Sequence, residues 1–151
     1  MKRMGTQTEH SVIVDATGLI LGRIGSNVSK RLLQGESVTI VNAENAIISG
    51  KRVSRVREKR KFLEIGHLGH GPYQPRRPDQ IIRRAVRGML PRRKPKGRDA
   101  YKRLKVFIGV PDEMKEKNFE TIPEAKAEKL KCPHFTVGEF AKEIGWTKGG
   151  E

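Results

Sequence analysis

Apolar and polar residues follow two periods in the first forty residues of the chain. Short apolar runs at 11–16 and 37–42 have the length and β-branched content of buried strands. The segment between them places apolar residues at helical spacing, at Leu21, Ile24, Val28 and Leu32. Gly35 follows this segment and is typical of a helix end. The pattern therefore predicts a helix over 21–33 inside a β–α–β unit with parallel strands.

A second helix is predicted to begin at Pro78, a residue suited to the first helical position, and to end before Pro91. Its apolar stripe comprises Ile81, Ile82, Ala85, Val86 and Met89. The opposite side carries Arg83, Arg84 and Arg87. One face of this helix can therefore pack on a core while the other presents guanidinium groups to an anion.

The residues after Pro91 form a predicted cationic loop. Five basic residues fall within seven positions, at Arg92, Arg93, Lys94, Lys96 and Arg98. Pro95 and Gly97 interrupt them and disfavour a continued regular helix. A short helix over 99–104, which includes Lys102, and a strand over 105–109 are expected to follow.

A further basic helix is predicted to follow Lys51 and to run to residue 63. Its buried side would hold Val53, Val56 and Leu63, and its outer side Arg52, Arg55, Lys59 and Arg60. The segment 66–75 is rich in Gly and Pro and predicts an exposed loop. In that loop, His67, His70 and Tyr73 either stack on unpaired RNA bases or face solvent.

The outer parts of the chain carry weaker patterns. Residues 1–10 are expected to form a flexible lead, and residues 11–151 a single domain. Within that domain we expect a C-terminal helical extension over 110–151, with helices at 123–130 and 137–146.

Charge changes this picture, because the chain carries 32 Lys and Arg against 17 Asp and Glu, a net +15 with a pI near 10.4. Residues 51–105 hold 20 of these bases and four acids, a net +16, and the remainder has a net −1. Charge concentrated in one third of the chain favours a polyanionic partner over general solubility. We expect a cytoplasmic protein without a membrane segment, since no apolar run approaches the roughly 20 residues of a spanning helix.

The β–α–β unit also raises a competing hypothesis, a dinucleotide-binding site. Gly18, Gly22 and Gly25 lie at a predicted strand-to-helix turn, and Glu44 follows the second strand. A pyrophosphate would rest on the helix N-terminus, with Glu44 on the ribose hydroxyls. The glycine spacing is G-x-x-x-G-x-x-G rather than G-x-G-x-x-G, which favours a helix-packing role for the glycines.

Other catalytic or metal-binding patterns are incomplete. His67 and His70 lie three residues apart without a local third ligand, and Cys132-Pro133-His134 offers only two. Asp15 ends a predicted strand, but no second acid or base is paired with it in the sequence. We therefore expect no enzyme activity, no metal and no cofactor.

Three pieces of the central segment carry a family resemblance: VRGMLP at 86–91, Gly97-Arg98 after a short basic spacer, and LKVFIG at 104–109. Together they resemble the signature of the large-subunit ribosomal protein L13 (uL13) family, in its archaeal or eukaryotic form. Thr17-Gly18 and the residues 21–24 are similar to the opening of the same family. The resemblance covers residues 12–109 and is weaker after them.

The resemblance implies an α/β fold of three layers, α/β/α, with a small, mostly parallel four-stranded sheet and basic loop and helix extensions. It also implies a structural constituent of the large ribosomal subunit that binds and stabilises folded 23S-type rRNA and supports subunit assembly. The implied partners are large-subunit rRNA and neighbouring ribosomal proteins, without a membrane or a small-molecule substrate. A nucleotide-binding α/β enzyme and a generic DNA-binding basic protein remain the alternatives.

The candidate rRNA-binding residues are the basic and aromatic side chains of the central third. They are Lys51, Arg52, Arg55, Lys59, Arg60, His67, His70, Tyr73, Arg76, Arg77, Arg83, Arg84, Arg87, Arg92, Arg93, Lys94, Lys96, Arg98 and Lys102.

Overall fold

The structure is a computed structural model that describes residues 11–66, 69, 71 and 73–147. Its central sheet is parallel, with the order β1 (Ser11–Asp15), β2 (Ser37–Val41), β4 (Leu104–Val106). Helix α1 (Leu21–Gln34) joins β1 to β2. The predicted parallel β–α–β unit is therefore confirmed, and its helix lies one residue from its expected end.

The α/β class is confirmed, whereas the parallel sheet has three strands in the described part of the chain instead of four. A single residue occupies the free edge of β1, where Glu120 forms an isolated parallel bridge with Val14. The Glu120 amide donates to the Ile13 carbonyl at 2.8 Å, and the Asp15 amide donates to the Glu120 carbonyl at 3.1 Å. The chain touches this edge at one residue and does not extend it into a strand.

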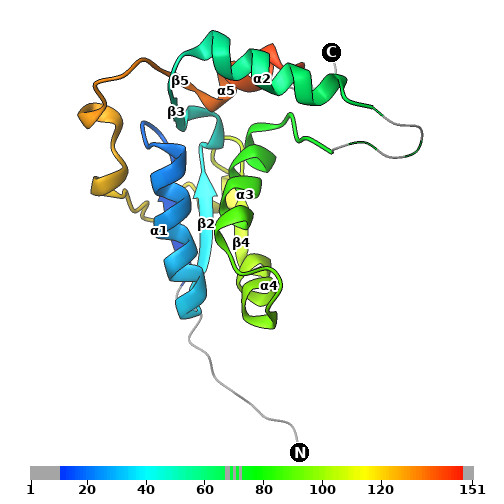
Figure 1. Cartoon of the computed structure of the whole chain (residues 1–151). Coiled ribbons are helices and arrows are strands. Elements are labelled where there is room, and N and C mark those ends of the chain that lie inside the picture. The colour runs from blue at the N-terminus through cyan, green and yellow to red at the C-terminus, as the bar shows by residue number, and fades with distance from the viewer. Residues whose placement is uncertain (1–10, 67–68, 70, 72, 148–151) are drawn as a thin grey trace, which may run out of the picture.

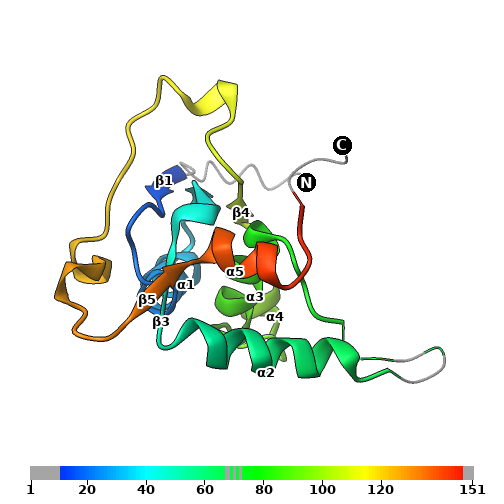
Figure 2. The same cartoon turned by 90° about the horizontal axis from the view of Figure 1, so that it is seen from above.

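Helices α1 and α3 (Pro78–Met89) lie side by side on one face of the sheet, and α4 (Pro95–Lys102) continues on the same side (Figures 1 and 2). The residues of β2 that face them, Val38 and Ile40, are fully buried. The opposite face carries Ile13, Thr39 and Lys105, which pair with one another across the three strands, and none of the described α-helices packs on it (Figures 1 and 2). Among the described residues, the three-layer arrangement is therefore replaced by helices on one face.

Helix α1 approaches α3 closely at Gly25. A Cβ atom at Gly25 would lie 2.9 Å from the Met89 sulfur. The C-terminal end of α1 is closed by Gly35 in the left-handed region, at φ 106°, and by the Arg103 guanidinium, which donates to the Leu32 carbonyl at 2.6 Å. These contacts join α1, α3 and the residue before β4.

A smaller unit lies beyond one end of the parallel sheet (Figure 1). Strands β3 (Ile47–Ser49) and β5 (His134–Thr136) pair antiparallel, and helices α2 (Arg52–Glu64) and α5 (Val137–Glu143) follow them. A capping box between Thr136 and Glu139 starts α5. The apolar centre of this unit consists of Val56, Phe135, Phe140 and Ile144.

Several details differ from the sequence-based expectations. Val53 was expected on the buried side of α2 but is 69% exposed, while Val56 is buried and Leu63 half-buried. The prediction of a helix at 123–130 is wrong, because that segment forms two 3-10 turns, Pro123–Ala125 and Ala127–Lys129. The predicted lead at 1–10 lies outside the described residues.

Candidate nucleic-acid interface

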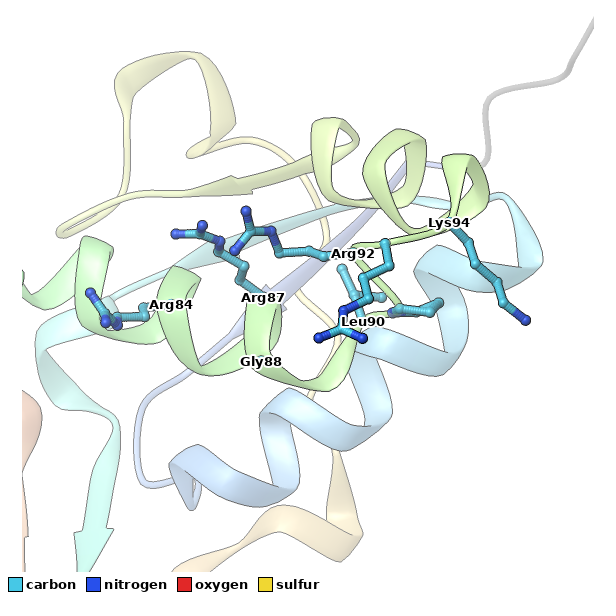
Figure 3. A pocket seen from close by; sticks show the side chains of 8 residues that line it. Arg84, Arg87, Gly88, Leu90, Arg92 and Lys94 are labelled. Atoms are coloured by element: carbon cyan, nitrogen blue, oxygen red, sulfur yellow. The ribbon is translucent and has the colours of Figure 1, made fainter.

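A cluster of cationic side chains surrounds a cavity of about 620 Å³ at the C-terminal end of α3 (Figure 3). We call it the cationic pocket, and its lining residues are Arg84, Arg87, Gly88, Leu90, Pro91, Arg92, Arg93 and Lys94. Five of these eight residues are basic and none is acidic. Such a surface can bind phosphate oxygens through charge-assisted hydrogen bonds, and cations near a helix C-terminus are further stabilised by the helix dipole.

Local sequence determines how the pocket forms. Pro91 disfavours helical backbone at the preceding residue, and Leu90 is accordingly extended, with φ −94° and ψ 145°. The Leu90 side chain is buried in the main core, which leaves the residues that follow at the surface. A turn then forms, in which the Lys94 amide donates to the Pro91 carbonyl at 3.0 Å. The basic residues 92–94 therefore project from a turn that is anchored at both ends.

The cationic loop is shorter than expected. Pro95 begins α4 instead of interrupting a loop, since proline fits the first helical position. Gly97 permits this arrangement because a Cβ atom at residue 97 would lie 2.2 Å from the Pro91 carbonyl oxygen. Lys96 and Arg98 consequently lie exposed on α4 and do not line the pocket.

The three arginines of α3 have different surroundings. The Arg83 guanidinium stacks over the Tyr101 ring of α4, 4.9 Å from the ring centroid, and does not line the cationic pocket. The Arg84 guanidinium donates to the Tyr73 carbonyl at 2.5 Å and lines the pocket with Arg87. Arg83 therefore fixes α4 against α3, whereas Arg84 and Arg87 line the cationic pocket.

Helix α2 forms a second cationic surface near the opposite end of α3 (Figure 1). Arg52 forms an ion pair with the Glu143 carboxylate, and Arg60 donates to the Glu143 carbonyl at 2.9 Å and 3.3 Å. These contacts attach α2 to the end of α5. Arg55 is exposed, and the half-buried Lys59 donates to the Gln74 side-chain oxygen at 2.6 Å.

The remaining candidates are distributed around these two surfaces. Arg77 pairs with Asp79 at the start of α3, with 3.1 Å between Nε and Oδ1, and Lys102 lies 3.7 Å from the Asp99 carboxylate. Three others are exposed: Lys51, Tyr73 and Arg76. His67 and His70 lie outside the described residues, so their predicted base contacts remain predictions.

Some residues of these surfaces were absent from the sequence-based set. Gly88, Leu90 and Pro91 shape the cationic pocket although they carry no charge. Arg57 and Lys61 are exposed on α2 and, with Arg60, line a shallow cavity of about 430 Å³. Arg60 and Lys61 follow Arg57 by three and four residues, and this spacing could have placed all three on one helix face from the sequence alone.

The geometry of the β–α–β unit differs from that of a dinucleotide site. The Glu44 carboxylate accepts the Gly109 amide at 3.0 Å and 3.2 Å, so it is engaged by the backbone of the chain itself. Gly25 packs against Met89, which agrees with the helix-packing interpretation of the glycines.

Asp15, the other acidic residue at this edge of the sheet, is held by hydrogen bonds within the fold. Its Oδ1 accepts from the Asn42 side chain at 3.0 Å, and from the Thr17 amide and hydroxyl at 3.0 Å and 2.8 Å. Partial burial raises the pKa of the Asp15 carboxyl, but these three hydrogen bonds together hold that pKa below its ordinary value. The ionised carboxylate thus organises the turn after β1.

The described residues, 11–66, 69, 71 and 73–147, contain neither a metal-binding cluster nor a helix that could span a membrane. No group of three metal-ligating side chains comes together there. No helix in that part of the chain has the length and apolar character needed to cross a membrane.

Comparison with known proteins agrees with the sequence resemblance. The profile of the family described as "Ribosomal protein L13" matches residues 9–113. The chain is 45% identical over 134 residues to a protein named "Large ribosomal subunit protein uL13" from Methanococcoides burtonii, and 47% identical over 135 residues to the protein of that name from Methanosarcina barkeri. Both alignments cover 88% of this chain and 96% of the relative.

A third protein of the same name, from Archaeoglobus fulgidus, is 43% identical over 136 residues, which are 89% of this chain and 87% of the relative. These relatives are named as ribosomal components and not as enzymes. With its α/β fold, its cationic middle third and this similarity over most of its length, the chain belongs to the ribosomal protein L13 family.

Proposed function

We propose that this protein is a structural constituent of the large ribosomal subunit that binds folded rRNA and supports subunit assembly in the cytoplasm. The relatives named "Large ribosomal subunit protein uL13" support the subunit assignment. The observation that carries rRNA binding is the cationic pocket, where five basic side chains converge without an acidic neighbour in the lining. Rigid elements hold this cluster together, which supports a role in binding a polyanion.

Binding at this surface is governed by phosphate neutralisation. Arginine and lysine side chains displace counterions condensed on RNA, and the released ions make the affinity dependent on salt. Phosphate contacts position a protein without reading base sequence. Specificity for folded rRNA therefore arises from the shape of the RNA against the pocket and α2, together with contacts to unpaired bases.

The test compares affinity for large-subunit rRNA with affinity for duplex DNA of equal length over a series of salt concentrations. The pocket variant is Arg92→Ala, Arg93→Ala, Lys94→Ala. We expect the intact protein to prefer rRNA, and the variant to lower the slope of log affinity against log salt by about two to three, close to one unit per lost phosphate contact.

The matched control removes the same charge away from the pocket, with Lys117→Ala, Lys126→Ala, Lys142→Ala at three exposed positions. We expect the control to retain the rRNA preference and most of the slope. Equal losses in the two variants would show that net charge alone drives binding. Equal affinity of the intact protein for rRNA and DNA would contradict the proposed function itself.

A further inference from the structure

A cavity of about 250 Å³, separate from the cationic pocket, lies between α2, β3, α5 and the residues that lead into α3. No residue lines both cavities. Four residues of α2 form one wall at positions 55, 58, 59 and 62, which share one helix face. Ile48 and Phe140 form the apolar side, and Gln74 lies across from α2. We call this space the α2–α5 cavity.

One hydrogen bond orients two polar side chains of the α2–α5 cavity, Lys59 and Gln74. Lys59 Nζ can only donate, and it lies 2.6 Å from the side-chain oxygen of Gln74. The Gln74 amide nitrogen is therefore turned away from Lys59 and can donate to another group. Partial burial, followed by the positive charge of Arg84, lowers the pKa of the Lys59 ammonium, and an acceptor that enters the cavity would relieve this unfavourable environment.

The cavity also offers an acceptor. The Glu58 carboxylate oxygen lies 3.9 Å from Arg55 Nη1, which is beyond hydrogen-bond distance, and both side chains are more than half exposed. A ligand with an N–H group could replace this loose ion pair by a direct hydrogen bond. The α2–α5 cavity thus presents donors from Lys59 and Gln74 and an acceptor from Glu58.

Aromatic side chains supply the remaining surface. Phe62 is 44% exposed beside the cavity, whereas Phe140 is only 8% exposed. Phe140 is held by Phe135, with ring centroids 5.9 Å apart. Flat apolar surface next to a few polar groups is typical of sites for unstacked nucleic-acid bases, whereas phosphate sites are dominated by cations. Two basic residues and one acidic residue line this cavity, against five basic and no acidic residues in the cationic pocket.

We propose that the α2–α5 cavity receives one unstacked base of the bound RNA, and this inference rests on the proposed function. The base stacks on Phe62, its carbonyl oxygen accepts from Lys59 or Gln74, and its exocyclic amino group donates to Glu58. Guanine and cytosine carry both groups, while adenine lacks the carbonyl and uracil lacks the amino group. Charge favours RNA over a protein segment here, because Arg55 and Arg84 lie close by and attract the flanking phosphates.

The test measures binding of the full chain to large-subunit rRNA with Phe62→Ala, and with Val53→Ala as the matched control. Val53 is 69% exposed on the same helix and does not line the cavity. We expect Phe62→Ala to weaken binding about tenfold, as loss of one stacked base does, and Val53→Ala to have no effect. The salt slope should be unchanged in Phe62→Ala because no phosphate contact is removed.

A second measurement identifies the occupant. Ultraviolet crosslinking of the intact complex, followed by mass spectrometry, should attach a guanosine or cytidine nucleotide to the peptide that contains Phe62. Unchanged affinity of Phe62→Ala for rRNA would overturn the base site while leaving rRNA binding intact. Loss of association with another large-subunit protein, at unchanged rRNA affinity, would show that a protein segment occupies the cavity and would also overturn it. Failure of the intact protein to prefer rRNA would instead reject the proposed function.

Discussion

Gly97 allows α4 to pack directly against the turn that carries the basic residues 92–94. It lies in the first turn of α4, where a Cβ atom would approach the Pro91 carbonyl oxygen to 2.2 Å and the carbonyl carbon to 2.5 Å. Both contacts are with backbone, so a flexible side chain cannot move aside to relieve them. Residue 97 therefore has to be glycine for the turn and the helix to meet as they do.

We predict that Gly97→Ala destabilises the protein. Alanine favours a helix over glycine by roughly 0.5–1 kcal/mol, whereas overpacking against backbone costs about 1–3 kcal/mol, so the clash outweighs the gain. Denaturant unfolding measures the change. Gly88→Ala is the control, since a Cβ there meets nothing within 4 Å, and it should leave stability unchanged or slightly raised. A neutral Gly97→Ala would show that the turn can move away without cost.

The contacts of two single residues, Arg83 and Glu44, could not be predicted from the sequence. The sequence placed Arg83 on the outer face of α3, yet its guanidinium stacks on the Tyr101 ring of α4. Glu44 followed β2 at the position of a ribose-binding acid, yet its carboxylate accepts the Gly109 amide. In both cases the partner lies far away in sequence, and periodicity carries no information about it.

At the scale of elements, the helices α1 to α3 and the three strands of the parallel sheet could be predicted, whereas the antiparallel pair of β3 and β5 could not. Helices α1 and α3 were predicted nearly to their ends because each buries a stripe of apolar residues and is followed by a glycine or a proline. Strands β3 and β5 have only three residues each, too few for alternation to be detected. They form by pairing across more than eighty residues of sequence, so the sequence predicted helices near α2 and α5 without the antiparallel strands that unite them in the smaller unit.

The ion pair between Glu120 and Arg31 attaches the segment near residue 120 to α1, and it predicts that the stability of the protein depends on pH. The Glu120 carboxylate forms two hydrogen bonds with the Arg31 guanidinium of α1, at 2.5 Å and 2.8 Å. Hydrogen bonding to Arg31 lowers the pKa of Glu120 despite its slight desolvation. A lowered pKa in the folded state means that this contribution to stability is present above the pKa of the unfolded chain and disappears as the pH falls through the folded value.

We therefore expect Glu120→Gln to lower the free energy of unfolding by about 0.2–1 kcal/mol at pH 7, the range of solvent-exposed ion pairs. The difference from the unaltered protein should vanish in acid, once Glu120 is protonated. Denaturant titrations at neutral and acidic pH measure both values. Glu116→Gln, an exposed carboxylate on the same segment, should have little effect at either pH. A difference that persists in acid would mean that Glu120 acts through packing instead of charge.

At the scale of the whole molecule, the cationic pocket and α2 lie toward opposite ends of α3 (Figure 1), and Arg84 is a link between them. Arg84 lines the pocket, donates to the Tyr73 carbonyl and acts electrostatically on Lys59. The outer face of the sheet has no comparable concentration of charge, since Lys105 is joined there by Ser37 and Thr39. The charge of the middle third is therefore distributed along the helical side of the fold.

This arrangement predicts that one RNA contacts both cationic surfaces at once. Arg92→Ala with Arg93→Ala removes two charges from the pocket, and Arg57→Ala with Lys61→Ala removes two from α2. Each pair should lower the salt slope of rRNA binding by about one to two, and the four changes together should lower it by the sum, because the sites are separate phosphate contacts of one complex. Filter binding over a salt series measures the three slopes. If the α2 pair left the slope unchanged, RNA would contact only the pocket end of α3, and the basic residues of α2 would serve the folding of the smaller unit instead.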